Sequence, residues 1–142
     1  MRVADWMSPD PITVTPWTSV RAARELLARE RVRHLPVLQG ERVVGIISDR
    51  DLSLDQGTVD RLARGGSAEP AEGEVRWLMS RPVHTAAADD ELVSAADRML
   101  SHRISALPVV DDEDRPLGIL TTTDCLLALL RTETLRGSAQ LG

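Results

Sequence analysis

Aromatic residues are nearly absent from this sequence. Its 142 residues include three Trp but no Phe and no Tyr, so aromatic side chains make up only 2% of the chain. A core must therefore be built from aliphatic side chains in close-packed layers, which disfavours a large aromatic pocket. The chain is still 42% hydrophobic and 27% charged. A globular unit of this length buries roughly 70% of the surface of its unfolded chain, so disorder throughout is excluded.

Cysteine and long apolar runs are scarce as well. A single cysteine, Cys125, excludes an internal disulfide and a cysteine-based zinc cage. Its neighbours Leu126 and Leu127 favour a buried, unreactive thiol. Three scattered histidines have no metal-ligand spacing, so we expect no metal site. No apolar run approaches the roughly 18 residues that cross a bilayer, and the N-terminus lacks the apolar segment of a signal peptide. We therefore expect a cytoplasmic protein without membrane contact.

Positive charge is in deficit. Against 22 Asp and Glu stand 17 Lys and Arg, for a net charge of -5 and a pI near 5.2. This balance makes nucleic acid an unlikely partner, because binding along a phosphate backbone usually needs a basic face. A local basic patch could still serve a small phosphate ligand. Because the sequence has no Walker-type glycine loop, paired carboxylates or nucleophile with an evident base, it predicts no catalytic residues.

The sequence repeats itself with an offset of about 72 residues. Met-Ser-Pro-Asp-Pro-Ile-Thr-Val, beginning at Met7, aligns with Met-Ser-Arg-Pro-Val-His-Thr, beginning at Met79. Leu-Pro-Val at 35–37 aligns with the same tripeptide at 107–109, and Gly-Ile-Ile-Ser-Asp-Arg-Asp at 45–51 matches Gly-Ile-Leu-Thr-Thr-Thr-Asp at 118–124. Landmarks that recur in the same order indicate an internal duplication.

The hydrophobic pattern of each repeat predicts strands and helices in the order β-α-β-β-α. We therefore expect a fold of the α/β (α+β) class. The first helix of each repeat carries apolar residues at helical spacing, and a charged or glycine-containing turn joins two strands after it. We expect the two repeats to pack together with pseudo-twofold symmetry, because neither buries enough apolar surface alone. In the first repeat we expect an extended segment over 11–14, a helix with Val20, Ala23 and Leu27 on one face, and strands over 35–38 and 43–48; in the second, a helix with Leu92, Ala95 and Met99 and strands over 107–110 and 117–120, with a closing helix after Ser48 and after Thr121. The predicted boundaries are 1–57 for the first repeat, 58–74 for a linker with a short helix over 58–63, 75–131 for the second repeat, and 132–142 for a C-terminal tail that frays from Gly137.

These motifs together resemble a cystathionine-β-synthase (CBS) domain pair, also called a Bateman module. The resemblance extends over residues 1 to 131 and rests on Met-Ser…Pro, Leu-Pro-Val and Gly-Ile-(Ile/Leu)-(Ser/Thr)-x-x-Asp, each present twice. It implies a stand-alone, non-catalytic regulatory module that needs no cofactor and binds adenosine-containing ligands, such as AMP, ADP, ATP, S-adenosylmethionine or NAD, in clefts between the repeats. It also implies disc-shaped homodimers and a regulated partner protein that the sequence does not name. The alternative is a structural or interaction module, including one that binds nucleic acid.

The Ser/Thr-x-x-Asp turns allow two interpretations. Ser48 with Asp51, and Thr121 with Asp124, have the position and spacing of helix N-terminal caps, where hydroxyl and carboxylate satisfy free amides. The same hydroxyl and the exposed amides suit a phosphate, while a carboxylate can accept hydrogen bonds from both hydroxyls of a ribose. The two roles are compatible.

The resemblance implies two composite clefts. Basic Arg33 and His34 enter a strand where the family faces ligand phosphates, whereas Arg29 and Arg31 are interpreted as a solvated helix end. One predicted cleft combines Ile12, Thr13, Arg33 and His34 with Thr121, Thr123 and Asp124; the other combines Val83, His84, Ser105 and Ala106 with Ser48, Arg50 and Asp51. Because Ser105 and Ala106 replace the basic pair, with Arg50 as partial compensation, we expect the two clefts to differ in affinity. Outside the clefts, Trp6 and Trp77 are expected to cover core edges, and the Leu126, Leu127, Leu129 and Leu130 stripe is either core or a dimer face.

Overall fold

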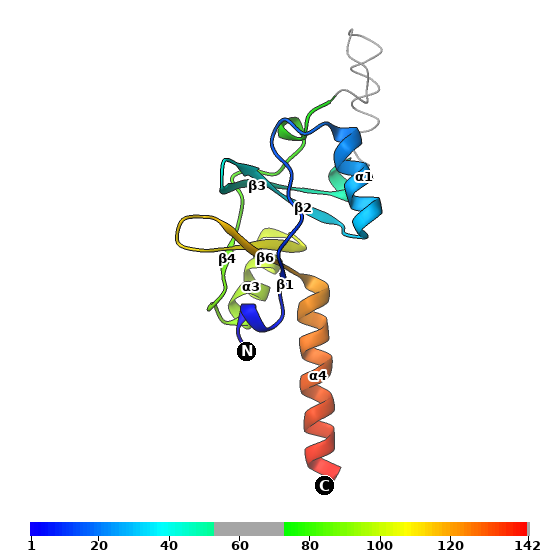
Figure 1. Ribbon diagram of the computed structural model, residues 1–142. Helices are drawn as coiled ribbons and strands as arrows, with labels where there is room; N and C mark the ends of the chain where they lie inside the picture. Colours follow the sequence, from blue (N-terminus) through cyan, green and yellow to red (C-terminus); the bar gives the residue numbers. More distant parts are fainter. Residues whose placement is uncertain (53–72, 142) are drawn as a thin grey trace.

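The computed structural model describes residues 1–52 and 73–141. The predicted linker and its short helix over 58–63 lie outside the described residues, apart from Gly73 and Glu74. Figure 1 shows the first repeat above the second, with a long C-terminal helix that runs away from both.

In the first repeat, helix α1 (Val20–Glu30) is capped at its N-terminus by the Ser19 hydroxyl, which accepts a hydrogen bond from the Ala22 amide at 3.0 Å. Val20, Ala23 and Leu27 are buried on one face, as their spacing predicts. The helix packs on the antiparallel hairpin of β2 (His34–Gln39) and β3 (Arg42–Ser48). The predicted extended segment over 11–14 is reduced to one parallel bridge between Val14 and Val37. Helix, hairpin and bridge enclose a core whose described residues are all aliphatic.

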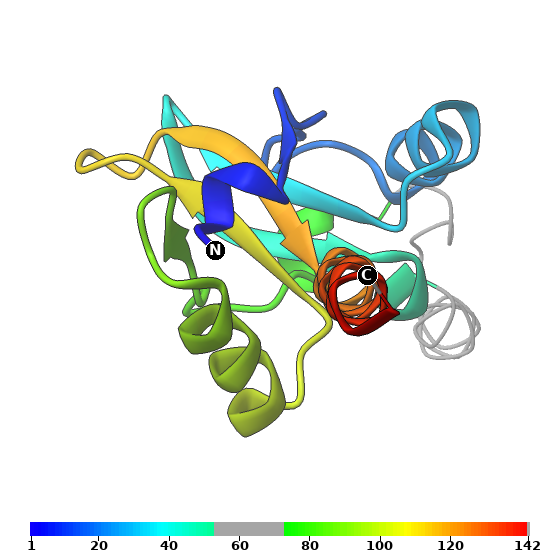
Figure 2. The ribbon, with the colours of Figure 1, turned by 90° about the horizontal axis from the view of Figure 1, so that it is seen from below.

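The second repeat has the same plan and a larger sheet. Helix α3 (Leu92–His102) buries Leu92, Ala95 and Met99. Its sheet has the order β1 (Ser8–Pro9), β6 (Pro116–Thr121), β5 (Ala106–Val110) and β4 (Ala86–Ala87), in which only β4 and β5 run parallel. Figure 2 shows α1 and α3 on opposite sides of the strands, so the two repeats place their hairpins together at the centre of the molecule.

The segment that opens each repeat packs on the other repeat. The 3-10 turn η1 (Val3–Asp5) buries Val3 in the second core, and β1 pairs with β6. The 3-10 turn η3 (Val75–Trp77) buries Val75 in the first core, and Ser80 bridges to Ile46 of β3. The boundaries predicted at 1–57 and 75–131 therefore separate the repeats along the sequence but not in space. This exchange makes the two cores interdependent.

The exchange also explains the paired Met-Ser and Gly-Ile motifs. A Cβ atom on Gly118 would lie 2.7 Å from Met7 Sδ and 2.7 Å from the Ser8 carbonyl oxygen. A Cβ atom on Gly45 would lie 2.8 Å from Met79 Sδ. Glycine is therefore needed on each hairpin because the Met-Ser segment of the opposite repeat occupies the space of a side chain.

Helix α4 (Thr122–Leu141) closes the second repeat and corrects one prediction. We expected a frayed tail from Gly137, yet the helix continues to Leu141. No proline follows Pro116, and one glycine within a helix costs only about 1 kcal/mol relative to alanine. The Leu126, Leu127, Leu129 and Leu130 stripe is exposed, whereas Ala128 is the α4 residue buried against the second core, so the stripe is not core. None of the described helices is long and apolar enough to cross a bilayer.

Candidate functional site

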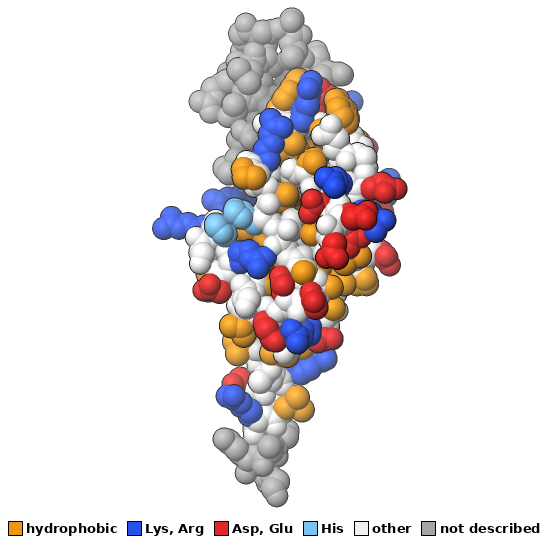
Figure 3. Space-filling model, turned by 90° about the vertical axis from the view of Figure 1, so that its left-hand side faces the viewer, with side chains coloured by type: hydrophobic (Ala, Val, Ile, Leu, Met, Phe, Trp, Pro, Cys, Tyr) orange, Lys and Arg blue, Asp and Glu red, His pale blue; other side chains and the backbone are white. Residues whose placement is uncertain are grey.

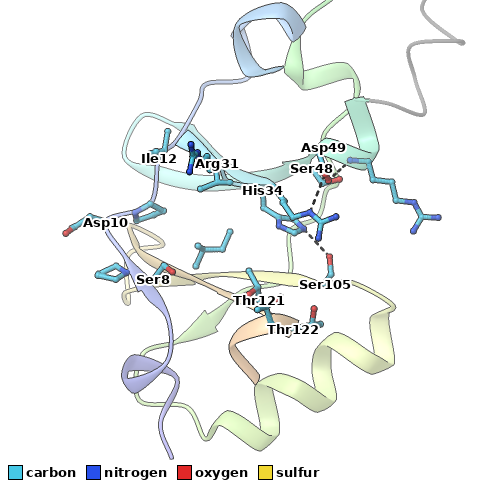
Figure 4. Close-up of a pocket in the computed structure, with 17 residues that line it drawn as sticks. Ser8, Asp10, Ile12, Arg31, His34, Ser48, Asp49, Ser105, Thr121 and Thr122 are labelled. Atoms are coloured by element: carbon cyan, nitrogen blue, oxygen red, sulfur yellow. Dashed lines mark hydrogen bonds and ion pairs between the residues drawn. The ribbon is translucent and has the colours of Figure 1, made fainter. Parts of the chain in front are cut away.

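A cleft of about 470 Å³ lies between the two repeats. Figure 4 shows that its wall comes from the segment before α1, from the hairpin of the first repeat, and from the start of α4. Aliphatic side chains line one part of it, among them Ile12, Val32 and Ile119. Cavities of this size are typical of small-molecule sites, in which apolar walls carry a few polar groups. We call it the larger cleft.

Five of the seven residues predicted for this cleft line it. They are Ile12, Arg33, His34, Thr121 and Thr123. Thr13 and Asp124 are not among the lining residues, so the structure does not bring them into the cleft. Asp124 turns back on its own helix, because its Oδ2 accepts hydrogen bonds from the Thr121 amide at 2.8 Å and the Thr121 hydroxyl at 3.1 Å.

A second cleft of about 300 Å³, the smaller cleft, lies on the other side of the hairpins. All seven residues predicted for it line its wall: Val83, His84, Ser105, Ala106, Ser48, Arg50 and Asp51. The two clefts differ in volume and in lining residues, and the expected difference in their affinities stays a prediction.

Both Ser/Thr-x-x-Asp turns act as helix caps. The Ser48 amide donates to Asp51 Oδ2 at 2.9 Å, and the Asp51 amide donates to the Ser48 hydroxyl at 3.0 Å. Thr121 and Asp124 form the same reciprocal pair. These bonds use Oδ2 of each carboxylate and leave Oδ1 outside the cap, so capping does not exhaust the acceptors of Asp51 in the smaller cleft.

Two arginines in strained backbone positions were missed by the sequence analysis. Arg31 ends α1 at φ 55° and lines the larger cleft, and Arg103 ends α3 at φ 55° and lines the smaller one. The left-handed region at a helix end normally takes glycine, because a Cβ atom there costs about 1–2 kcal/mol. Interpreting Arg31 as part of a solvated helix end was therefore incomplete. The signal in the sequence was the 72-residue offset, which aligns Arg31 with Arg103.

The predicted basic pair, Arg33 and His34, carries less positive charge into the larger cleft than its residue types suggest. Arg33 Nε lies 3.4 Å from Asp49 Oδ2, so a carboxylate partly offsets its charge, at a side chain that is 80% exposed. Burial lowers the pKa of His34 below its ordinary value, with Arg33 adding to that effect and Asp49 and Asp51 opposing it. His34 is therefore a neutral hydrogen-bonding group near pH 7. The remaining positive charge of the larger cleft comes from Arg31 and Arg50.

The first turn of α4 adds a further positive potential to the larger cleft. Thr121, Thr122 and Thr123 all line it, and α4 is a helix of 20 residues. The N-terminus of such a helix carries a partial positive charge, which favours an anion, although the Thr122 and Asp124 amides already donate to the Ser105 carbonyl and the Thr121 hydroxyl. Apolar walls, arginine and a helix N-terminus in one cleft are suited to a ligand with a flat apolar part and a phosphate.

Histidine side chains mark the face beside the smaller cleft. His84 stacks on His102 with ring centroids 3.8 Å apart. Figure 3 shows histidine among basic side chains near the middle of one face of the molecule, while acidic side chains gather elsewhere on that face.

Within residues 1–52 and 73–141 there is no group of three or more side chains that could hold a metal ion. Of the tryptophans beside the Met-Ser motifs, Trp6 packs on the second core, but Trp77 is 61% exposed, so its predicted role at a core edge is wrong.

The model of the CBS domain matches residues 3–54 and 73–131, which is most of the chain. The chain belongs to the CBS domain family. Both repeats of the pair are matched, in agreement with the duplication read from the sequence. A CBS pair from protein MJ0100, in complex with 5′-methylthioadenosine and S-adenosyl-L-methionine, superimposes with a TM-score of 0.79 at 29% identity, covering 93% of this chain and 98% of that one.

Other relatives contain this CBS pair in different settings. CBSX2 in complex with AMP matches with a TM-score of 0.78 and 31% identity, covering 93% of this chain and 98% of that chain. The homoserine O-acetyltransferase of Methanocorpusculum labreanum is 35% identical over 123 residues, which are 86% of this chain and 23% of that protein. The chain spans less than half the length of the first curated relatives it matches. The CBS pair is thus one part of such enzymes.

Proposed function

We propose that this CBS pair is a non-catalytic regulatory module whose larger cleft binds an adenosine-containing ligand of the AMP, ADP or ATP class. The observation that carries the proposal is the meeting of aliphatic walls, Arg31 and the N-terminus of α4 in one cleft between the repeats. The CBS pairs solved with AMP, and with S-adenosyl-L-methionine and 5′-methylthioadenosine, support adenosine as the common part of the ligand.

The cleft offers each part of such a ligand a matching surface. Adenine is flat and apolar on its faces, so Ile12 and Ile119 suit it without an aromatic platform. Arg31 and Arg50 present forked donors to phosphate oxygens, which is the geometry that favours arginine over lysine at phosphates. All 17 basic residues of the chain are arginine.

The smaller cleft is proposed as a second, weaker site of the same ligand class. Arg50 and Arg103 supply its cations, and Asp51 Oδ1 is an acceptor for ribose hydroxyls. Ligand binding would draw the two repeats together across the clefts and change a surface that a partner protein recognises. Such a change requires the ligand to bind one arrangement of the repeats more tightly than the other.

Thermal melting against AMP, ADP, ATP, S-adenosylmethionine and NADH tests the proposal. A ligand at about 100 times its Kd stabilises the fold by about 2.7 kcal/mol. For a chain of this size we expect the melting temperature to rise by about 5–10 °C. Arg31→Glu should remove most of this shift. If no adenosine compound raises the melting temperature of the wild type, the proposal is wrong.

We also propose that the module is a homodimer formed through α3 and α4. An apolar groove of about 510 Å³ lies between these helices, and Leu100, Leu126 and Leu129 expose more than half of their side chains beside it. The occupant we propose is the same face of a second copy, because a self-complementary contact would cover both exposed stripes at once. The equivalent face of α1 has Arg21 and Arg24 where α3 has Val93 and Ala96. Leu100→Glu should therefore shift sedimentation toward the monomer, and Ala28→Glu at the matching position of α1 should not.

A further inference from the structure

The two clefts share one wall. His34, Ser48, Arg50 and Ser105 line both the larger and the smaller cleft. His34 begins β2 in the first repeat, Ser105 directly precedes β5 in the second, and His34 Nε2 lies 3.1 Å from Ser105 Oγ. Figure 4 shows this contact bridging the gap between the repeats. The partition between the clefts is therefore only one pair of side chains thick.

The partition contains one shared cation. His34 is half-buried and its lowered pKa keeps the imidazole neutral near pH 7, so it does not compensate a phosphate charge. The Ser48 hydroxyl already accepts the Asp51 amide within the helix cap. Within the part of the chain that the structure describes, no carboxylate forms an ion pair with the Arg50 guanidinium. Arg50 is thus the charged group of the wall that a ligand in either cleft can recruit.

We infer that the two clefts are negatively coupled: an anionic ligand in one weakens an anionic ligand in the other through Arg50 and the His34–Ser105 partition. This inference rests on the proposed function, in which both clefts take phosphate-bearing adenosine ligands. Two effects have the same sign. The second ligand loses the Arg50 contact that the first has taken, and two phosphates on either side of a wall one pair of side chains thick repel each other.

Negative coupling has a consequence for which ligands can bind together. Two copies of an anionic ligand are disfavoured, whereas an anionic ligand beside an uncharged adenosine compound is not, because the uncharged one neither needs Arg50 nor repels a phosphate. The pair would then respond to AMP over a wider range of concentrations than two independent sites do. It would also favour occupancy by two different ligands.

Calorimetric titration with AMP measures the coupling. Arg31 belongs to the larger cleft alone and Arg103 to the smaller alone, at matching positions of the repeats, so Arg31→Glu and Arg103→Glu are paired single-cleft variants. Both residues are exposed, and melting of the ligand-free variants checks that each remains folded. The wild type should give two Kd values, and Arg31→Glu should give the Kd of the smaller cleft alone. We expect the higher of the two wild-type values to exceed the Kd of Arg31→Glu by at least about fivefold.

Two further titrations locate the coupling in the wall. Arg50→Ala should lower that ratio, because only the repulsion between the two phosphates then remains, and adenosine as the second ligand on AMP-loaded protein should show no weakening. If the two single-cleft isotherms add up to that of the wild type, or if AMP in one cleft strengthens the other, the coupling is refuted while the proposed function stands. If none of AMP, ADP and ATP binds the wild type at either cleft, both are refuted.

Discussion

Replacing Arg31 by glycine distinguishes a binding role of this side chain from a structural one. If the side chain serves the cleft, the variant should be more stable than the wild type; if the side chain stabilises the fold, the variant should be less stable. Arg31 ends α1 in the left-handed region, at φ 55° and ψ 42°, and its amide donates to the Leu27 carbonyl. Relief of the Cβ clash gains about 1–2 kcal/mol, and the greater freedom of glycine in the unfolded chain offsets about 0.5–1 kcal/mol. We therefore expect Arg31→Gly to be more stable than the wild type by about 0.5–1 kcal/mol, which raises the melting temperature by about 2–4 °C.

The same change removes a cation from the larger cleft. A hydrogen bond to a charged group contributes about 1.5–3 kcal/mol, so the Kd for AMP should rise by about 10- to 100-fold. Melting of the ligand-free protein measures the first effect, and calorimetric titration measures the second. Arg103→Gly is the matched control: it has the same backbone conformation at φ 55° and ψ 44°, but lines the smaller cleft. It should gain the same stability and keep the affinity of the larger cleft.

Two results would refute this reasoning. A lower melting temperature of ligand-free Arg31→Gly would mean that the side chain stabilises the fold through native contacts. An unchanged affinity for AMP, with the stability gained as expected, would mean that the strained arginine does not serve the cleft.

Three other predictions concern packing and protonation. Gly118→Ala should lower the free energy of unfolding by about 1–3 kcal/mol, because the new methyl group meets Met7; denaturant titration measures this, with Gly137→Ala, which meets no atom within 4 Å, as a control that should not destabilise. Burial lowers the pKa of His34, so the contribution of this residue to stability is fully present above its ordinary pKa of 6.5 and is lost as pH falls through the folded value. His34→Gln should therefore lose less stability than the wild type between pH 7.5 and 5. Equal losses would contradict the assignment. Burial and the nearby Asp124 raise the pKa of the half-buried Cys125 thiol, so alkylation of the native protein at pH 8 should be slower than that of a free cysteine peptide, and an equal rate would contradict it.

The elements and their buried faces could be predicted because they depend on local sequence. The three-and-four spacing of Val20, Ala23 and Leu27 places them on one helix face whatever the helix packs against. The turn at Gly40, with φ 66°, fixes the hairpin in the same local way. The frayed tail was wrong because small and polar residues near Gly137 lower helix propensity without ending a helix that has already begun.

The candidate clefts were predicted less evenly. For the smaller cleft, all seven residues carried over from the family resemblance line its wall, and their role in binding stays a prediction. For the larger cleft, Thr13 and Asp124 are not among the residues that line it, whereas Asp51, which forms the same helix cap as Asp124, lines the smaller cleft. Arg31 and Arg103 were missed because the left-handed conformation at a helix end is a property of the backbone, and an arginine in the sequence does not indicate it.

By itself, the sequence determined the duplication, the aliphatic cores and the family, because these depend on periodicity and on motifs that occur twice in order. Tertiary structure alone decided that each Met-Ser segment crosses to the other repeat and that the clefts meet at His34 and Ser105. Those contacts join residues that are far apart in the sequence, 71 positions in the case of His34 and Ser105, and nothing in local spacing specifies which side chains meet when two repeats pack face to face. It also decided the charge of the clefts. A guanidinium that is paired with Asp49, and an imidazole that burial keeps neutral, look the same in a sequence as two free cations.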